Sequence, residues 1–187
     1  MQKIRTIFER DWTGDKSLVI DKPHPDCAWV FAGEGVATQK YDGTSCLVKD
    51  GKLYKRLELK AGKEPADFIL ADNDPVTQKI VGWTPVGDGP EDRWHREALA
   101  LEDGEIADGT YELLGPKIQG NPEGHSIHVL QSHSEADVFP DAPRTFDDLK
   151  VWLSARDIEG LVFHHPDGRM AKIKKRDFGL KRIPDAA

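Results

Sequence analysis

The sequence has few cysteines and no long apolar run. Its 187 residues include only two cysteines, Cys27 and Cys46, which are too few for a disulfide framework or a four-ligand zinc site. We therefore expect both to be packing residues in a reducing compartment, and we expect a cytoplasmic protein. No stretch approaches the roughly 18 consecutive apolar residues of a membrane-spanning helix. Residues 1–20 carry charges and lack the apolar core of a secretory signal.

Glycine and proline, in contrast, are frequent. The 17 glycines and 12 prolines divide the chain into many short elements, which favours strands and turns over a helical bundle. A composition with 38% hydrophobic and 32% charged residues excludes collagen, a coiled coil and a disordered tail. The length predicts one domain over residues 1–187 with a core that needs no disulfides.

Charge is distributed unevenly along the chain. The whole sequence has a net charge of −7, but segments 49–63 and 165–187 each have a net charge of +4. Segment 64–112, between them, has a net charge of −10. A protein that binds phosphates needs a positive site and not a positive total, so nucleic acid stays open as a partner. The alternative interpretation is that the two basic segments are solvated strand faces and the acidic segment is a surface loop, none of which binds a partner.

The order of apolar and turn residues predicts a mostly antiparallel α+β fold. Residues 62–90 are rich in glycine, proline and aspartate and predict a long loop. Thr145 is placed to cap a following helix. There is no glycine-rich P-loop and no G-x-G-x-x-G, which excludes a Walker-type NTPase and a dinucleotide-binding fold. The predicted elements are a three-stranded meander over 35–40, 44–48 and 52–57, helices over 91–102 and 146–156, and strands over 110–114, 127–130, 159–163 and 169–174.

One lysine stands in a short motif that can carry chemistry. Lys40 begins the sequence K-x-D-G at the end of a predicted strand. A lysine amine is a nucleophile once desolvation or a nearby cation removes its proton. The motif alone is weak, because Asp42 and Gly43 also form an ordinary turn pair. Four further patterns follow in order, all on predicted strands: Tyr54-Lys55-Arg56, Tyr111-Glu112-Leu113-Leu114, Glu159-Gly160-Leu161-Val162 and Lys172-Ile173-Lys174.

This ordered set resembles the covalent nucleotidyltransferase superfamily of polynucleotide ligases and mRNA-capping enzymes. The stretch from about residue 38 to 176 is involved, and the loop after Glu112 is most similar to that of compact ATP-dependent 5′–3′ RNA ligases. The resemblance implies an adenylation-domain fold, ATP-grasp-like, with antiparallel sheets around a nucleotide cleft and Lys40 at its floor. It also implies ATP as AMP donor, Mg²⁺ or Mn²⁺ as cofactor, and RNA 5′-phosphate and 3′-hydroxyl ends as substrates.

The resemblance further implies a role for each matched residue. Lys40 would attack the α-phosphate of ATP, and Glu159 would hold the metal ion. Lys172 and Lys174 alternate with Ile173, so both face one side of a strand and would offset phosphate charge. The remaining nucleotide-binding candidates are Gln39, Asp42, Gly43, Arg56 and Glu112, with Lys55, Lys117 and Asn121 as contacts to RNA or phosphate. Plain structural roles in strands and turns are the alternative for each of these residues.

Two departures from the superfamily pattern bear on function. Many members place an arginine two residues after the K-x-D-G glycine, but Thr44 and Ser45 follow Gly43 here. The nucleotide contact that this arginine makes in other members would pass to Thr44, Ser45 or Arg56. In addition, 13 residues follow Lys174, so we expect no oligonucleotide-binding barrel, and a helper protein could supply the RNA grip. The alternatives are a DNA nick ligase, a capping guanylyltransferase, or a silent nucleotide- or RNA-binding module; the sequence is also compatible with a phage origin.

Overall fold

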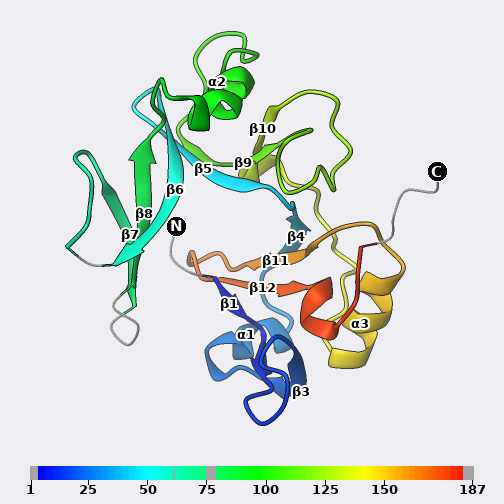
Figure 1. Cartoon of the computed structure of the whole chain (residues 1–187). Coiled ribbons are helices and arrows are strands. Elements are labelled where there is room, and N and C mark those ends of the chain that lie inside the picture. Colours follow the sequence, from blue (N-terminus) through cyan, green and yellow to red (C-terminus); the bar gives the residue numbers. More distant parts are fainter. Residues whose placement is uncertain (1–3, 61, 75–78, 183–187) are drawn as a thin grey trace. The chain divides into compact units, whose positions relative to one another are not determined.

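The computed structural model describes residues 4–60, 62–74 and 79–182, which form two compact units (Figure 1). The central unit contains Asp42–Glu135, and the terminal unit contains Ile4–Tyr41 together with the chain from Ala136 onward. The expectation of one domain over residues 1–187 stays a prediction, since two lobes of one domain and two domains both produce such a division. Among the described residues, no helix is long and apolar enough to cross a membrane.

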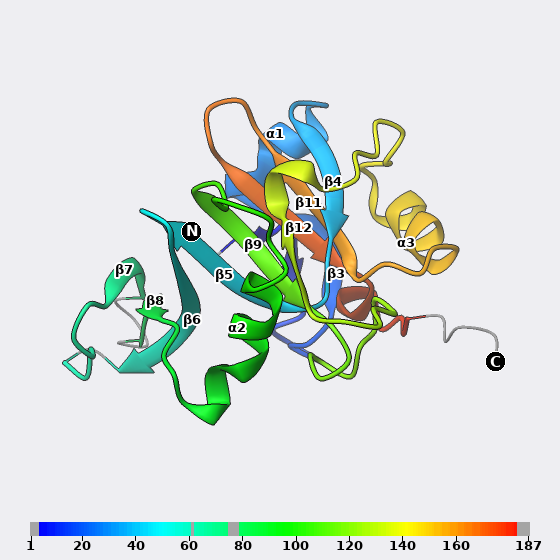
Figure 2. The ribbon, with the colours of Figure 1, turned by 90° about the horizontal axis from the view of Figure 1, so that it is seen from above.

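The terminal unit contains, within its described residues, a four-stranded sheet in the order β1-β12-β11-β4 (Figure 1). Figure 2 shows β12, β11 and β4 of this sheet from above. Strand β1 is parallel to β12, and the other neighbours are antiparallel. A β2-β3 hairpin and short helices accompany this sheet. The elements are β1 (Arg5–Thr6), β2 (Phe8–Arg10), β3 (Val19–Pro23), η1 (Pro25–Cys27), α1 (Ala28–Phe31), β4 (Val36–Lys40), α3 (Phe146–Ser154), β11 (Gly160–His164), β12 (Met170–Lys174) and η4 (Lys175–Phe178).

The core of the terminal unit follows the apolar pattern of the sequence. Leu149 and Leu153 of α3 are fully buried against Leu161 and Ile173 of the sheet, as the helix periodicity predicts. The Thr145 side chain accepts a hydrogen bond from the Asp148 backbone N–H, which confirms the predicted cap. In β12, Ile173 is buried and the lysines on either side of it point to the opposite face.

The central unit contains an antiparallel six-stranded sheet among its described residues, in the order β10-β9-β5-β6-β8-β7. Its core gathers Cys46, Val48, Leu53 and Leu113 under helix α2. Neither of the two larger sheets closes into a barrel within the described residues. The elements are β5 (Thr44–Lys49), β6 (Lys52–Lys60), β7 (Ile69–Asp74), β8 (Lys79–Pro85), η2 (Pro90–Asp92), α2 (Arg93–Leu99), β9 (Gly109–Leu114), β10 (Val129–Ser132) and η3 (His133–Glu135).

Two sequence-based predictions are wrong. The expected loop over 62–90 contains β7 and β8, because Ile80 and Trp83 are buried and Gly82 lets the two strands approach closely. The expected meander over 35–57 is divided: β5 and β6 form a hairpin, but β4 pairs with β11 of the terminal unit. Ala37 of β4 is buried in the terminal core, and this long-range packing outweighs the local turn signal. The overall α+β class with mostly antiparallel sheets is confirmed.

Candidate functional site

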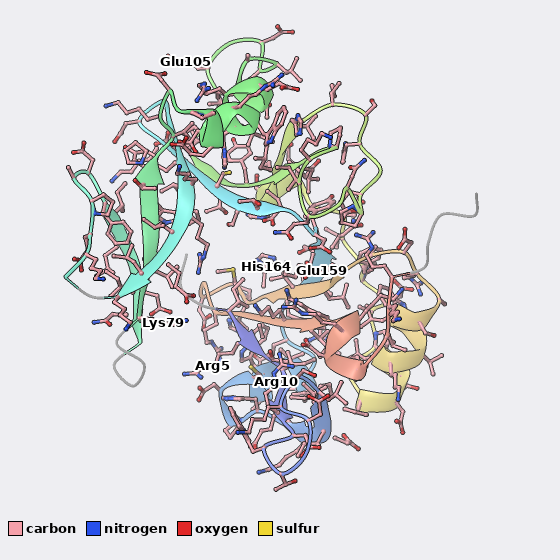
Figure 3. All side chains as sticks on the ribbon, in the orientation of Figure 1. Arg5, Arg10, Lys79, Glu105, Glu159 and His164 are labelled. Carbon is pink, nitrogen blue, oxygen red and sulfur yellow. The ribbon has the colours of Figure 1, made fainter. Side chains whose placement is uncertain are left out.

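Four charged side chains of the terminal unit gather where three strands meet. Gly160 is paired with Lys40 of β4 on one side and with Lys174 of β12 on the other. Glu159, immediately before β11 and labelled in Figure 3, therefore contacts both lysines. One of its oxygens lies 2.6 Å from Lys40 Nζ, and the other lies 2.6 Å from Lys174 Nζ. We call Lys40, Glu159, Lys172 and Lys174 the lysine–carboxylate cluster.

The glycine after Glu159 makes this geometry possible. A Cβ at position 160 would lie 2.1 Å from the carbonyl oxygen of Ile173 and 2.8 Å from the Cα of Lys174. A side chain there would push β11 away from β12. The Glu-Gly pair thus has a physical reason: the glycine brings the strands together, and the glutamate at that closest point reaches both lysines.

Burial and charge perturb two members of the cluster. Only 8% of Glu159 is exposed, and this burial acts to raise the pKa of its carboxyl group. The charges of Lys40 and Lys174 outweigh burial, so the pKa of Glu159 is lowered overall. Burial, followed by the charges of Lys174 and Lys40, lowers the pKa of Lys172 to about 8. Three amines thus outnumber the two carboxylates that act on Lys172, Glu159 and Asp177, and this excess of positive charge suits an incoming anion.

The cluster offers one carboxylate to a metal ion. Both oxygens of Glu159 face ammonium groups, and no cluster of three or more His, Cys, Asp or Glu side chains in the described part of the chain could hold a metal. Mg²⁺ commonly binds through one or two carboxylates together with substrate phosphates and water. Glu159 therefore fits such an ion only when phosphate oxygens supply the other ligands of the ion. The phosphate would also have to take over the ion pairs that Lys40 and Lys174 make with Glu159.

In the central unit, a second buried carboxylate holds the K-x-D-G turn. Glu112 of β9 is 7% exposed, and one of its oxygens accepts a hydrogen bond of 3.2 Å from the Gly43 backbone N–H. A Cβ at position 43 would lie 2.3 Å from the carbonyl oxygen of Leu113 and 2.8 Å from the Cγ of Glu112. Only glycine fits between this turn and β9. The Asp42 backbone N–H donates to Glu123 at 2.9 Å.

Three contacts around Glu112 and the K-x-D-G turn could not be found from sequence motifs. His133 Nε2 lies 3.1 Å from the second oxygen of Glu112, and His133 Nδ1 lies 3.0 Å from the Thr110 hydroxyl. Glu123 reaches Asp42 across 81 positions of sequence. No local pattern links residues so far apart. Only the pairing of β9 with β5 and β10 places them together.

The two basic candidates of β6 have contacts of different kinds. Lys55 is paired with Asp92, a carboxylate that is 2% exposed and also accepts a 2.8 Å hydrogen bond from Gly87 N–H. Lys55 is thus engaged within the central unit. The Arg56 guanidinium lies 5.6 Å from the centre of the Trp83 ring. Burial lowers the pKa of Arg56, although Asp72 and Glu112 act to raise it.

The remaining candidates lie in less specialised surroundings. Gln39 is half-buried on β4, and its backbone N–H donates to the Asp137 carbonyl. Lys117 is exposed in the loop after β9. Asn121 in the same loop uses both ends of its amide on the backbone of His125, at 3.0 Å each. Ser45, which follows the K-x-D-G motif, faces Glu112 in the strand register, and its hydroxyl is buried without a hydrogen-bond partner.

The structure thus brings the predicted residues together in two groups. The terminal unit joins Lys40, Glu159, Lys172 and Lys174, and the central unit joins Gly43 with Glu112. The K-x-D-G motif supplies both groups, since Lys40 belongs to the terminal unit and Gly43 to the central unit. A hollow of about 340 Å³ in the central unit is lined by other residues, among them Glu105.

Comparison with known families identifies the chain's relatives. A family model described as RNA ligase 1 matches residues 78–186, which is more than half of the chain. The chain belongs to the RNA ligase 1 family. The match to the family model includes Glu112, Glu159, Lys172 and Lys174, and Lys40 precedes it.

Curated members of the RNA ligase 1 family show the same relationship. RNA ligase 1 of Rattus norvegicus and that of Mus musculus are each 26% identical to this chain over 219 aligned residues. Each alignment covers 78% of this chain and 67% of the relative. RNA ligase 1 of Pongo abelii is 31% identical over 105 residues, which cover 51% of this chain and 32% of the relative. Membership supports an RNA ligase-like function and RNA as the class of substrate.

Proposed function

We propose that this chain is an ATP-dependent RNA ligase that joins 5′-phosphate and 3′-hydroxyl RNA ends through a lysyl-AMP on Lys40. The observation that carries the proposal is the lysine–carboxylate cluster, in which Lys40 and Lys174 each lie 2.6 Å from the same buried carboxylate. Membership of the RNA ligase 1 family supports the same reading. The corresponding fold would be the adenylation domain of the covalent nucleotidyltransferases.

In the first step, the Lys40 amine attacks the α-phosphorus of ATP. A P–N bond forms, the bond to the bridging oxygen breaks, pyrophosphate leaves, and the amine loses a proton. Charge neutralisation and positioning dominate such phosphoryl transfers. Lys172 and Lys174 supply positive charge beside the phosphate. Glu159 would hold Mg²⁺ together with phosphate oxygens, and the ion would supply neutralisation of phosphate charge. The proton that Lys40 loses passes to solvent.

The two later steps move AMP to the RNA and then release it. The 5′-phosphate of one RNA end attacks the lysyl-AMP phosphorus, which breaks the P–N bond and returns the amine of Lys40. The 3′-hydroxyl of the other end then attacks the activated 5′-phosphate, and AMP leaves as the phosphodiester forms. We assign nucleoside contacts to the central unit, with Glu112 accepting hydrogen bonds from the ribose hydroxyls and Arg56 contacting ribose or phosphate. A partner protein would add RNA grip.

The test is covalent labelling of the chain. The protein is mixed with Mg²⁺ and ATP labelled at the α-phosphate, after treatment with pyrophosphate to strip any AMP already bound. We expect acid-labile label on the denatured wild-type chain, none on Lys40→Ala, and full label on Lys150→Ala, a control at an exposed lysine of α3. The same variants that take up label should also join 5′-phosphate RNA ends, and Lys40→Ala should not. Label from GTP alone would instead indicate a capping activity, and no label would indicate a binding module.

A further inference from the structure

His133 stands beside the proposed nucleotide-binding carboxylate, and no sequence motif includes it. Thr110 and Glu112 are two residues apart on β9, so their side chains point to the same face of the sheet. His133 follows β10, the strand paired with β9, and its ring reaches both side chains. The ring is a quarter exposed, whereas the carboxyl group of Glu112 is 9% exposed. The histidine therefore lies between solvent and a buried acceptor.

The hydrogen-bond directions in this group follow from its chemistry. A carboxylate only accepts, so His133 Nε2 donates to the second oxygen of Glu112 at 3.1 Å. With Nε2 protonated, the Nδ1 atom of a neutral ring accepts from the Thr110 hydroxyl at 3.0 Å. The first oxygen of Glu112 accepts from Gly43 N–H at 3.2 Å. Each carboxylate oxygen thus has one fixed donor within the central unit.

We propose that His133 is a positioning residue that holds Glu112 in the orientation required to bind the ribose hydroxyls of ATP. The inference rests on the proposed function and names a residue that the motifs do not contain. An oxygen with one hydrogen bond made retains a second lone pair for a ligand. Two donors on opposite oxygens fix the plane of the carboxylate, and therefore the direction of the remaining lone pairs. Without His133, the hydrogen bond from Gly43 N–H would be the one that remains of the two described for Glu112, and the side chain would rotate more freely.

A positioning role predicts loss of selectivity for the ribose, beyond a loss of rate. The label from ATP is compared with that from 2′-deoxy-ATP and 3′-deoxy-ATP, and kcat and KM for adenylation are measured with each. We expect the wild type to prefer ATP over at least one deoxy analogue by about tenfold or more, the value of one hydrogen bond to a charged group. His133→Leu should reduce that preference severalfold and raise KM for ATP more than it lowers kcat.

Two further variants and a control separate positioning from folding. His133→Gln keeps an N–H donor and should retain more of the preference than His133→Leu, and Thr110→Val, which keeps the shape of the side chain, should lose part of it. These variants decide the question if the leucine variant does not fold. The control is His165→Leu in the terminal unit, where the histidine pairs with Glu34 and Asp167 at 2.7 Å each. It should leave the preference unchanged.

Each remaining outcome has a definite meaning. Label on the wild type, with equal losses for ATP and both deoxy analogues in His133→Leu, would give His133 a structural role only and overturn the inference. A wild type that labels equally well with all three nucleotides would overturn it also, because Glu112 would then not bind ribose. In both cases the proposed function stands. No label on the wild type from any of the three nucleotides would overturn the proposed function and the inference with it.

Discussion

Each unit of the chain contains a lysine paired with a buried carboxylate, and the two pairs differ in their balance of charge. In the central unit, Asp92 faces Lys55 and accepts its other strong hydrogen bond from a neutral backbone N–H. In the terminal unit, Glu159 faces Lys40 and Lys174, and burial together with the charges of these two lysines lowers the pKa of Lys172. One lysine balances Asp92, whereas the three lysines of the cluster outnumber Glu159 and Asp177, the carboxylates that act on Lys172.

The difference separates stability from function. A balanced buried pair adds nothing for a ligand to bind, and breaking it strands a charge. A cluster with excess positive charge attracts an anion, and the carboxylate holds the lysines apart until the anion arrives. We therefore expect the Lys55–Asp92 pair to matter for folding and the lysine–carboxylate cluster to matter for chemistry. The predictions below test that division, from the largest effect to the smallest.

The largest difference between the two pairs should appear when the lysine of each pair is replaced by arginine. Lys40→Arg keeps a positive group beside Glu159 but removes the amine that would carry AMP, because a guanidinium is always protonated. We expect the label from ATP to fall by at least about a thousandfold, since a nucleophile is lost altogether. Lys55→Arg keeps the pair with Asp92 and should label within about twofold of wild type. Equal losses in the two variants would remove the distinction between the pairs.

Alanine at the same two positions should reverse the order when stability is measured. Lys55→Ala leaves Asp92, which is 2% exposed, without its lysine partner, and should lower the free energy of unfolding by about 3 kcal/mol. Lys40→Ala leaves Glu159 with Lys174 and should cost about 1 kcal/mol. Urea denaturation gives both values. A larger loss in Lys40→Ala would contradict the assignment of the cluster to chemistry.

Alanine substitutions at the two motif glycines, Gly43 and Gly160, should lower stability by similar amounts, unlike the substitutions at the two lysines. Alanine at Gly43 or at Gly160 would place a Cβ 2.3 or 2.1 Å from a backbone oxygen. We expect each variant to lose about 1–3 kcal/mol of stability, as overpacked sites do. Gly87→Ala is the matched control, because the nearest atom to its Cβ would be 3.6 Å away. Thermal or urea unfolding measures all three, and a loss in the control as large as in the motif glycines would argue against a steric cause.

The sequence alone was most informative where local pattern and long-range packing agree. The alternation around Ile173 gave the correct face for Lys172 and Lys174, and Thr145 gave the correct start of α3. The strand order could not be read in the same way. Lys40 and Gly43 are neighbours in a turn signal, yet β4 joins the terminal sheet and β5 the central one. The sheet that β4 joins depends on which hydrophobic core buries Ala37, and burial of this kind depends on residues far away in the sequence.

The candidate site shows the same limit. The motifs pointed to Lys40 and Glu159, and the structure places their charged groups 2.6 Å apart. Lys55, which the resemblance offered as a contact to RNA or phosphate, pairs with Asp92 in the structure, and its contact to RNA stays a prediction. The sequence did not predict His133 or Glu123 as site residues, because hydrogen bonds between residues far apart in sequence leave no local pattern. Charge type is visible in a sequence, whereas the balance of charge around each group requires the fold.

The last prediction, with a change of at most about 1.4 kcal/mol for each pH unit, is a pH dependence of stability that arises in the lysine–carboxylate cluster. The folded pKa of Lys172 is about 8, below the ordinary 10.5, so the folded state resists protonation of this amine. The unfolded chain binds the extra proton between these two values, and stability should rise with pH across that window by at most about 1.4 kcal/mol per pH unit. Lys172→Met removes this titration. Its stability advantage over wild type should be constant below pH 8 and shrink above it. Urea denaturation of the wild type and of Lys172→Met at each pH gives both stabilities, and an advantage that stays constant up to pH 10.5 would contradict the prediction.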